Sequence, residues 1–239
     1  MALGRSSAAT AQQEAYQAIL LAIRSGRYRP GERLIPETIA QKLAMSRMPV
    51  REAFQRLANE GLVQIRPNRG CVVSSLTIEE IDETFQMRSV LEGLAVRLAM
   101  PRIDAAVLDD LDDRLRRMER IERTEGDWLA EHQAFHEHIA ALAGRPKLLA
   151  QIAALHLAVE PYMRIWFHHV DRPVTATRKQ HVVVEAMRKA LQTGDAAHAE
   201  QAMRDHVMRT APLLADFLRS RGHPNTGQRA TREIAASVD

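Results

Sequence analysis

The sequence predicts a mainly α-helical protein with one small β element near its N-terminus. Apolar residues recur with a period of 3.6 along most of the chain, which is typical of amphipathic helices. One stretch alternates instead: β-branched residues flank a Pro-Asn-Arg-Gly turn at 67–70, as in a β-hairpin. Glycine and proline interrupt the helical pattern repeatedly, so several helices of ordinary length are expected.

The composition is that of a globular protein. Of the 239 residues, 46% are apolar and 26% are charged, which separates the chain from disordered ones. Cys71 is the only cysteine, which excludes an internal disulfide and a cysteine-cluster metal site and suits a reducing cytosol. No apolar run approaches the roughly 20 residues of a membrane helix, and no secretory signal is visible. We therefore expect a cytoplasmic protein without a membrane partner.

Charge is divided unevenly along the chain. Residues 1–75 contain 11 Arg and Lys against 5 Asp and Glu, a net charge of +6. Residues 76–239 contain 22 against 25, a net charge of −3. A basic segment joined to a mildly acidic one indicates that only the first meets a polyanion.

The first 75 residues predict three helices followed by a hairpin. Pro36 stands near the start of the second helix, where its missing N–H costs little. Ser46 precedes the third helix, which its hydroxyl is expected to cap, and Gly61 ends that helix. The expected elements are helices over 11–24, 35–44 and 47–60 and a hairpin over 62–73. This order is that of a winged helix-turn-helix.

From Thr77 onward every segment has the helical period. Thr77 and Glu80 form a predicted capping box at the start of this region. The expected helices are 78–99, 104–124, 127–143, 146–168, 175–193 and 195–220. The complete prediction is an N-terminal winged helix-turn-helix plus a C-terminal all-helical bundle of six or seven helices. The expected domains are 8–75 and 76–221, followed by a polar tail, 222–239, that is expected to be disordered.

The third helix places three polar side chains in a stripe. Arg47, Arg51 and Gln55 are spaced by four and lie beside the apolar face that carries Val50 and Phe54. Such a stripe is a solvated face, a phosphate clamp or a set of base readers. In a winged helix-turn-helix the third helix enters the major groove, where arginine pairs bidentately with guanine. The position therefore favours base readers.

Short motifs run through the first domain in a fixed order. They are Pro30-Gly31, Arg33-Leu34, Ser46-Arg47-x-Pro49-Val50-Arg51-Glu52-Ala53, Arg56-Leu57, Glu60-Gly61-Leu62-Val63 and Gly70. Together they resemble the DNA-binding domain of the GntR family of bacterial transcription regulators. The all-helical remainder, with MRSVLEGLAVRLA and AFHEHIAALAG, is similar to the effector domain of that family's FadR-type branch, called FCD.

The resemblance implies a set of DNA contacts and a DNA partner. A symmetric homodimer would read a pseudo-palindromic operator in double-stranded DNA. The chain departs from the family at Ala44 and Met48, where glycine and threonine are usual, and at Glu37, where a basic residue is common. These departures bear on the operator sequence rather than on DNA binding. The expected DNA-binding residues are Arg33, Ser46, Arg47, Met48, Arg51, Gln55, Asn68, Arg69 and Gly70.

Two charged residues interrupt the apolar face of the first C-terminal helix. Arg88 and Glu92 are one turn apart in the middle of this face. A buried pair of this kind is an internal ion pair or half of an anion pocket. In the FCD domains that the chain resembles, an arginine at this place faces the effector, so both residues are candidates for effector binding.

Three histidines are placed like metal ligands. His132 and His136 share one helix face, and His206 is at the centre of another apolar face. Related FCD domains bind a divalent metal through Asp-x-x-x-His and two further histidines, and the metal anchors a carboxylate effector. Here His132 takes the aspartate position and Val184 replaces one histidine. Three imidazoles still suit Zn or Ni. The alternatives are a metal-free effector pocket lined by the same residues and a purely structural role.

The sequence thus predicts a ligand-responsive, sequence-specific transcription regulator, a repressor rather than an enzyme, that senses a small carboxylate. Two alternatives remain open. One is a metal-dependent hydrolase fused to a nucleic-acid-binding domain, in which the three histidines activate water. It lacks a well-placed general base and leaves the basic domain unexplained. The other is an effector-free architectural DNA-binding protein, which leaves the polar interior of the helical domain unexplained.

Overall fold

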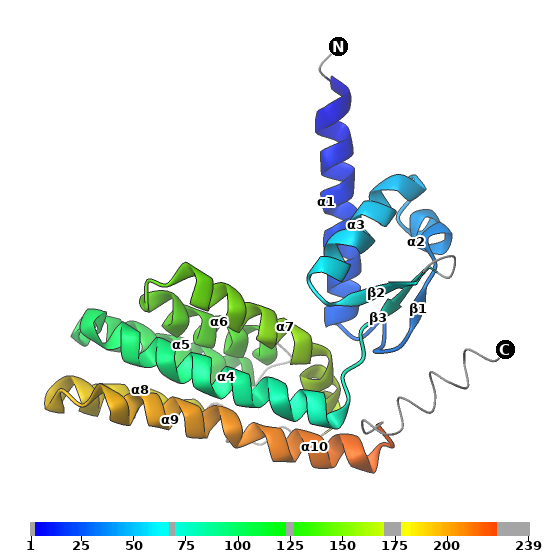
Figure 1. Ribbon diagram of the computed structural model, residues 1–239. Helices are drawn as coiled ribbons and strands as arrows, with labels where there is room; N and C mark the ends of the chain where they lie inside the picture. The colour runs from blue at the N-terminus through cyan, green and yellow to red at the C-terminus, as the bar shows by residue number, and fades with distance from the viewer. Residues whose placement is uncertain (1–2, 67–69, 123–126, 170–177, 224–239) are drawn as a thin grey trace. The chain divides into compact units, whose positions relative to one another are not determined.

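The computed structural model describes residues 3–66, 70–122, 127–169 and 178–223. They form two compact units, Met1–Leu76 and Thr77–Asp239 (Figure 1). None of the described helices is both long and apolar enough to cross a membrane. The predicted fold class, mainly α with one small sheet, is confirmed. Nearly all of the expected polar tail lies outside the described residues.

The first unit consists of three helices and a small antiparallel sheet (Figure 1). The strand order is β1-β3-β2, with Arg33 opposite Val72 and Ile65 opposite Cys71. This is the predicted winged helix-turn-helix. The elements are α1 (Leu3–Arg24), β1 (Arg33–Leu34), α2 (Pro36–Lys42), α3 (Arg47–Asn59), β2 (Val63–Arg66) and β3 (Gly70–Val73).

The core of the first unit lies between α1, α3 and the sheet. Burying a large aliphatic or aromatic side chain contributes about 1.5–3 kcal/mol, so the apolar face of α3 fixes which side of that helix meets water. The side chains that fill this core are Ile19, Ile23, Leu34, Val50, Phe54, Leu57, Val63 and Val73.

The turn before α3 differs from expectation. Ser46 is the N-cap residue, but its hydroxyl makes no hydrogen bond to the helix, so the predicted cap is wrong. Ser46 is exposed, and water is available to the first N–H groups of α3 instead. Ala44 adopts a φ of 53°, a left-handed conformation that is uncommon for residues with a side chain. The turn thus keeps the backbone that glycine would adopt without strain.

Strand β1 was not predicted from the sequence. It is two residues long, too short to show alternation, and it is defined only by pairing with β3. Helix α1 also begins earlier than expected, at Leu3 instead of residue 11. The hairpin tip, 67–69, lies outside the described residues.

The second unit is all-helical within the described residues (Figure 1). The predicted capping box is confirmed: Thr77 accepts a hydrogen bond from the Glu80 N–H, and the Glu80 carboxylate accepts one from the Thr77 N–H. The elements are α4 (Ile78–Ala99), a 3-10 turn η1 (Met100–Arg102), α5 (Ala105–Glu122), α6 (Trp128–Leu142), α7 (Pro146–His169), α8 (Arg178–Thr193), α9 (Ala196–Met208) and α10 (Thr210–Ser220).

The expected last helix is in fact two helices. Helix α9 ends at Met208 and α10 begins at Thr210. Pro212 has no N–H to donate to the Met208 carbonyl, and its ring crowds that carbonyl, which explains the break. Helix α4 contacts α6, α7, α9 and α10. Polar side chains on the buried face of α4 therefore meet side chains from several helices at once.

Candidate functional site

The polar stripe of α3 lies on the surface of the first unit. Arg47, Arg51 and Gln55 are exposed, whereas Val50 and Phe54 of the same helix are buried. All three polar side chains are therefore accessible to an external partner. The helix presents them because its apolar residues take the other face.

Met48 is exposed beside this stripe. Its side chain leaves 65% of its surface in solvent, the largest value among the exposed large apolar residues of the described chain. A methionine in this position contributes almost nothing to the core. Its apolar surface is available to a partner at the N-terminal end of α3.

Glu37 adds a negative charge next to the stripe. Its carboxylate lies 3.4 Å from Arg47 Nη1, and both side chains are substantially exposed. An exposed ion pair of this kind contributes about 0–1 kcal/mol to stability. The pair therefore orients the Arg47 guanidinium and offsets its charge rather than holding the fold together.

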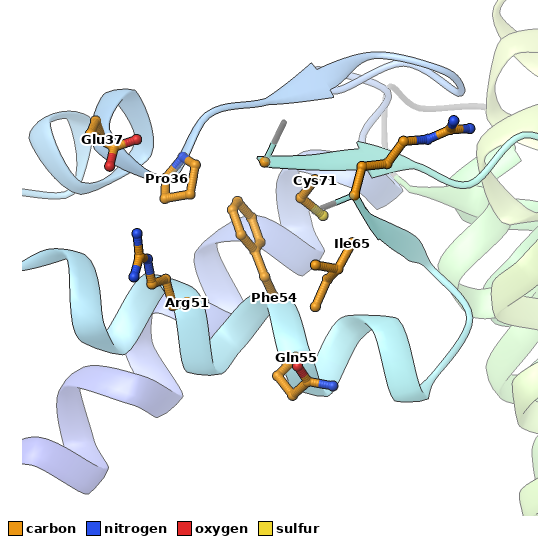
Figure 2. A pocket seen from close by; sticks show the side chains of 9 residues that line it. Pro36, Glu37, Arg51, Phe54, Gln55, Ile65 and Cys71 are labelled. Atoms are coloured by element: carbon orange, nitrogen blue, oxygen red, sulfur yellow. The ribbon is translucent and has the colours of Figure 1, made fainter. Parts of the chain in front are cut away.

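A pocket of about 460 Å³ lies between α2, α3 and the hairpin (Figure 2). Figure 2 shows Arg51 and Gln55 extending from α3, with Ile65 on the neighbouring strand. Burial raises the pKa of the Cys71 thiol to about 12, so this thiol stays protonated and unreactive at neutral pH. The pocket is lined by Pro36, Glu37, Arg51, Phe54, Gln55, Ile65, Arg66, Gly70 and Cys71.

The structure gathers some of the predicted DNA-contact residues and leaves others apart. Arg51, Gln55 and Gly70 line the pocket of Figure 2, and Ser46 and Arg47 line a neighbouring hollow. Arg33 lies on β1 with its side chain exposed. The two remaining predicted residues, Asn68 and Arg69, lie outside the described residues.

Gly70 has a backbone reason to be glycine. Its φ is +81°, and a Cβ placed on it would lie 2.8 Å from the Leu34 carbonyl oxygen. Residues with side chains rarely adopt this φ, and the carbonyl belongs to the paired strand β1. Gly70 therefore permits the close approach of β1 and β3 at the base of the hairpin tip.

A network of buried polar side chains occupies the interior of the second unit. Arg88 Nε donates to Glu92 Oε1 at 2.9 Å, and His136 Nδ1 lies 2.6 Å from Glu92 Oε2. His156 Nε2 lies 3.1 Å from both Glu92 Oε1 and Arg88 Nη2. All four side chains are at most 5% exposed. The predicted pair on α4 is thus an internal ion pair that extends to two histidines.

Glu92 is ionised within this network. Burial alone would raise the pKa of its carboxyl group, but the positive charge of Arg88, together with the contacts to His156 and His136, outweighs burial and holds this pKa well below its usual range. Burial and the Arg88 charge lower the pKa of His156 to about 4, although Glu92 partly opposes this shift. His156 is therefore neutral at pH 7.

The three predicted metal ligands lie together. One ring nitrogen from each of His132, His136 and His206 falls within 4.8 Å of the other two. His136 Nε2 and His206 Nδ1 are buried and have no hydrogen-bond partner among the described residues. Burial lowers the pKa of His132 well below its usual range and that of His206 to about 3. These two rings are therefore neutral and offer lone pairs.

The unpartnered nitrogens distinguish this trio from a second cluster. Leaving a buried polar atom unpaired costs about 1–3 kcal/mol, so His136 Nε2 and His206 Nδ1 indicate a missing partner. Glu92, His136 and His156 also lie within 4.8 Å of one another, but Arg88 contacts two of them. The positive charge of Arg88 opposes a cation there. The His132, His136 and His206 trio is the one that fits a metal ion.

Aromatic rings border the trio on one side. Trp128 stacks on His132 with ring centroids 4.8 Å apart, and Phe167 lies 5.0 Å from Trp128. The His136 and His206 rings are stacked 5.4 Å apart. His132 is only partly buried. The trio is thus closed on most sides and most exposed at His132.

His156 was missed in the sequence. It lies on the α7 face that also buries Ile152 and Val159, and this spacing of three and four residues was a usable signal. Val184 is buried on α8. His181, one turn before it, contacts Glu119 at 3.0 Å and stays partly exposed, so it does not join the trio.

Comparisons with known proteins match both units. The family model for bacterial regulatory proteins of the gntR family matches residues 11–73, and the model for the FCD domain matches residues 83–209. The chain is 27% identical over 195 residues to the HTH-type transcriptional repressor GlaR of Escherichia coli (strain K12), covering 79% of this chain and 89% of GlaR. It is 29% identical over 180 residues to the HTH-type transcriptional repressor RspR of the same strain, covering 74% of this chain and 77% of RspR.

A solved structure shares the fold. The structure of E. coli McbR/YncC gives a TM-score of 0.71 at 21% sequence identity, covering 86% of this chain and 97% of that one. The two other functions that the sequence left open, a metal-dependent hydrolase and an effector-free architectural protein, find no support in these matches.

Proposed function

The chain belongs to the gntR family of bacterial regulatory proteins and carries an FCD domain, and from this premise we propose how it acts. It is a transcription regulator whose first unit binds DNA and whose second unit is the effector-binding domain. We propose that it is a homodimeric repressor that senses a small carboxylate. The names of the relatives GlaR and RspR support repression. The proposal is carried by one juxtaposition: an exposed basic helix and a buried set of unpartnered imidazole nitrogens in the same chain.

The exposed stripe of α3 would read bases in the major groove. Arg47 and Arg51 can each pair bidentately with guanine O6 and N7, which discriminates against other bases by about 1–3 kcal/mol. Gln55 suits adenine N6 and N7, and the exposed Met48 suits a thymine methyl group. These four side chains would set the operator sequence.

Other residues of the first unit would position the protein on the duplex. Arg33, Ser46 and Gly70, with Asn68 and Arg69 of the hairpin tip, would contact phosphates or the minor groove. Such contacts fix register and orientation without reading sequence. Because they release counterions, affinity should fall steeply as salt rises.

His132, His136 and His206 would hold one divalent cation, Zn²⁺ or Ni²⁺. Their nitrogens lie within 4.8 Å of one another, which is close enough for all three to ligate one ion. Three neutral ligands leave the charge of the ion uncompensated, which favours an anionic effector. When bound, the ion would supply a Lewis-acid site for the effector carboxylate, and Arg88 and Glu92 would border this pocket through His136.

The effector would act by favouring one arrangement of the dimer. A ligand shifts a conformational equilibrium only by its difference in affinity for the two states. A two-fold dimer presents two α3 helices to two half-sites, so operator affinity depends on their spacing. Binding of a carboxylate in the helical units would change that affinity by changing the spacing.

Selection of duplexes from a random DNA pool, followed by gel shifts, tests the DNA part. The Arg47→Ala, Arg51→Ala double variant should lose at least tenfold in affinity for the selected duplex. Arg116→Ala is the matched control, because it removes an exposed arginine from α5 of the other unit. Equal binding by the wild type and the double variant would overturn the proposed reading helix.

Tryptophan fluorescence tests the metal part. Trp128 stacks on His132, so titrating the metal-free protein with Zn²⁺ or Ni²⁺ should change its emission. His206→Ala should abolish this response, whereas His138→Ala should not, because His138 of α6 contacts Asp110 of α5 instead of the three histidines. A wild type that ignores both ions but is stabilised by small acids would favour the metal-free pocket instead.

A further inference from the structure

We propose that Glu92 is the positioning residue of the candidate metal centre. It holds His136 with its proton on Nδ1, so that the lone pair of Nε2 is directed toward His132 and His206. The inference rests on the metal centre proposed above. The question is which ring nitrogen of His136 carries the proton. Distances and burial in the metal-free protein already constrain the answer.

The short contact between His136 and Glu92 places the proton. Glu92 Oε2 lies 2.6 Å from His136 Nδ1, and both side chains are at most 2% exposed. A carboxylate only accepts hydrogen bonds, so Nδ1 must be the donor. With Nδ1 engaged by the carboxylate, Nε2 is the ring nitrogen left to offer a lone pair to an ion. That nitrogen is buried and has no hydrogen-bond partner among the described residues.

Glu92 is itself held by two other side chains. Its Oε1 accepts from Arg88 Nε at 2.9 Å and lies 3.1 Å from His156 Nε2, whereas its Oε2 faces His136. The two oxygens therefore have separate partners. Arg88, at 5% exposure, cannot turn to solvent without leaving the buried carboxylate without its arginine partner. This fixes the position of the oxygen that orients His136.

The same contacts argue against Glu92 as a metal ligand. An ion between Glu92, His136 and His156 would have to displace the Nδ1 hydrogen bond and approach the Arg88 guanidinium, which lies 3.1 Å from His156. Two cations so close in a buried site repel strongly. The His136 nitrogen that is free of such contacts is Nε2. Glu92 thus acts on an ion through His136 and not directly.

A carboxylate behind a ligating histidine has two effects on a metal site. It selects the tautomer and ring orientation, and it makes the ligating nitrogen more basic. Loss of such a partner typically lowers metal affinity 10- to 100-fold. In this arrangement Arg88 holds the Glu92 carboxylate in place. The effector carboxylate would then bind at the position of the ion that the three histidines do not occupy.

Glu92→Gln tests the proposal in the full-length chain. Glutamine keeps the size of the side chain but removes its charge. Glu160→Gln is the matched control, because Glu160 is also buried and pairs with an arginine one turn away, Arg164, at 2.9 Å. Zn²⁺ affinity is measured by competition with a chromophoric chelator. We expect Glu92→Gln to weaken Zn²⁺ binding 10- to 100-fold and Glu160→Gln to leave it within twofold.

The tautomer is measured without any change to Glu92. Long-range ¹H–¹⁵N NMR correlations of the metal-free wild type distinguish a protonated ring nitrogen from one with a lone pair, and His136→Gln assigns the signals. We expect the proton on Nδ1. A proton on Nε2 overturns the proposal, even if Glu92→Gln does not fold.

The outcomes separate this proposal from the metal centre itself. If the wild type binds Zn²⁺ and Glu92→Gln binds it equally well, Glu92 is not a positioning residue and the metal centre stands. If the wild type binds neither Zn²⁺ nor Ni²⁺, the metal centre is wrong, and the role of Glu92 in it falls with it. A selective loss in Glu92→Gln, with the proton on Nδ1, supports both.

Discussion

The exposed stripe of α3 and the buried cluster around His136 both contain charged side chains, but the two sites differ in how far these side chains are exposed to water. Arg47 of the stripe pairs with Glu37 of α2 in water, whereas Arg88 and Glu92 pair at no more than 5% exposure. An ion pair in water contributes little to the free energy of unfolding, so each side chain can leave it to contact an external partner. In the interior every polar group needs a partner within the protein.

This difference predicts how function and stability are coupled in each unit. The stripe side chains Arg47, Arg51 and Gln55 can be replaced with little effect on folding, because none of them belongs to the core. Side chains around His136 share hydrogen bonds, so removing one leaves others unpaired. If the two sites act as proposed, DNA specificity can change residue by residue, whereas the effector site must change as a set.

The largest effect is expected for Glu92→Ala. It leaves the Arg88 charge buried without its carboxylate partner and should lower the free energy of unfolding by about 3–5 kcal/mol. Trp128 and Trp166 are the only tryptophans and both lie in the second unit, so denaturation followed by tryptophan fluorescence reports on that unit. A loss of less than 1 kcal/mol would mean that the buried cluster contributes no more to stability than the exposed stripe does.

A double substitution sharpens this result. Arg88→Met with Glu92→Leu removes both charges and should be less destabilising than Glu92→Ala alone, because no charge is left unpaired. If the double variant is instead the less stable of the two, the network stabilises the unit through its histidines rather than through charge pairing.

The next effect concerns DNA binding and not stability. Arg51→Ala should weaken binding to a selected duplex by about 1–3 kcal/mol while the melting temperature stays unchanged. If Arg51 reads a base, the slope of log affinity against log salt should stay the same. A slope smaller by about 0.9 would instead make Arg51 a phosphate contact.

The first unit was predictable because its signals are local. The apolar spacing of α3 placed Arg47 and Arg51 on the exposed face, and Gly61 marked the end of the helix, as the structure has it. The two errors in this unit were also local. Strand β1 was not predicted because it is too short to show a pattern, and the predicted N-cap was wrong because Ser46 precedes α3 without capping it. Single-residue details depend on solvent and on partner strands, which spacing does not reveal.

The interior of the second unit was only partly predictable. The period of 3.6 placed Arg88, Glu92, His136 and His206 on buried faces. His156 lies 64 residues from Glu92 in sequence, and their contact depends on how α7 packs against α4. One sequence shows which faces are buried but not which buried faces meet. The histidine that completes the network was therefore missed.

Gly70→Ala tests a backbone constraint in the first unit. A methyl group there would meet the Leu34 carbonyl at 2.8 Å with φ at +81°, so β1 and β3 must shift. We expect a loss of about 1–3 kcal/mol in the stability of the first unit, measured by circular dichroism. Gly26→Ala is the control, because a Cβ there meets nothing within 4 Å although its φ is also positive. Equal losses in the two variants would assign the effect to φ alone.

Glu37→Gln should have the smallest effect, and its sign is informative. The substitution removes an exposed ion pair worth about 0–1 kcal/mol, so stability should hardly change. It also removes a negative charge from the surface proposed to meet phosphates and frees the Arg47 guanidinium. We expect affinity for a non-specific duplex to rise about two- to fivefold, equivalent to less than 1 kcal/mol.

If binding to the selected duplex falls while non-specific binding does not, Glu37 accepts a hydrogen bond from a cytosine amino group. The exposed surface would then contain an acidic side chain that contacts a base. The departure from the family at Glu37 would in that case help to determine the operator sequence.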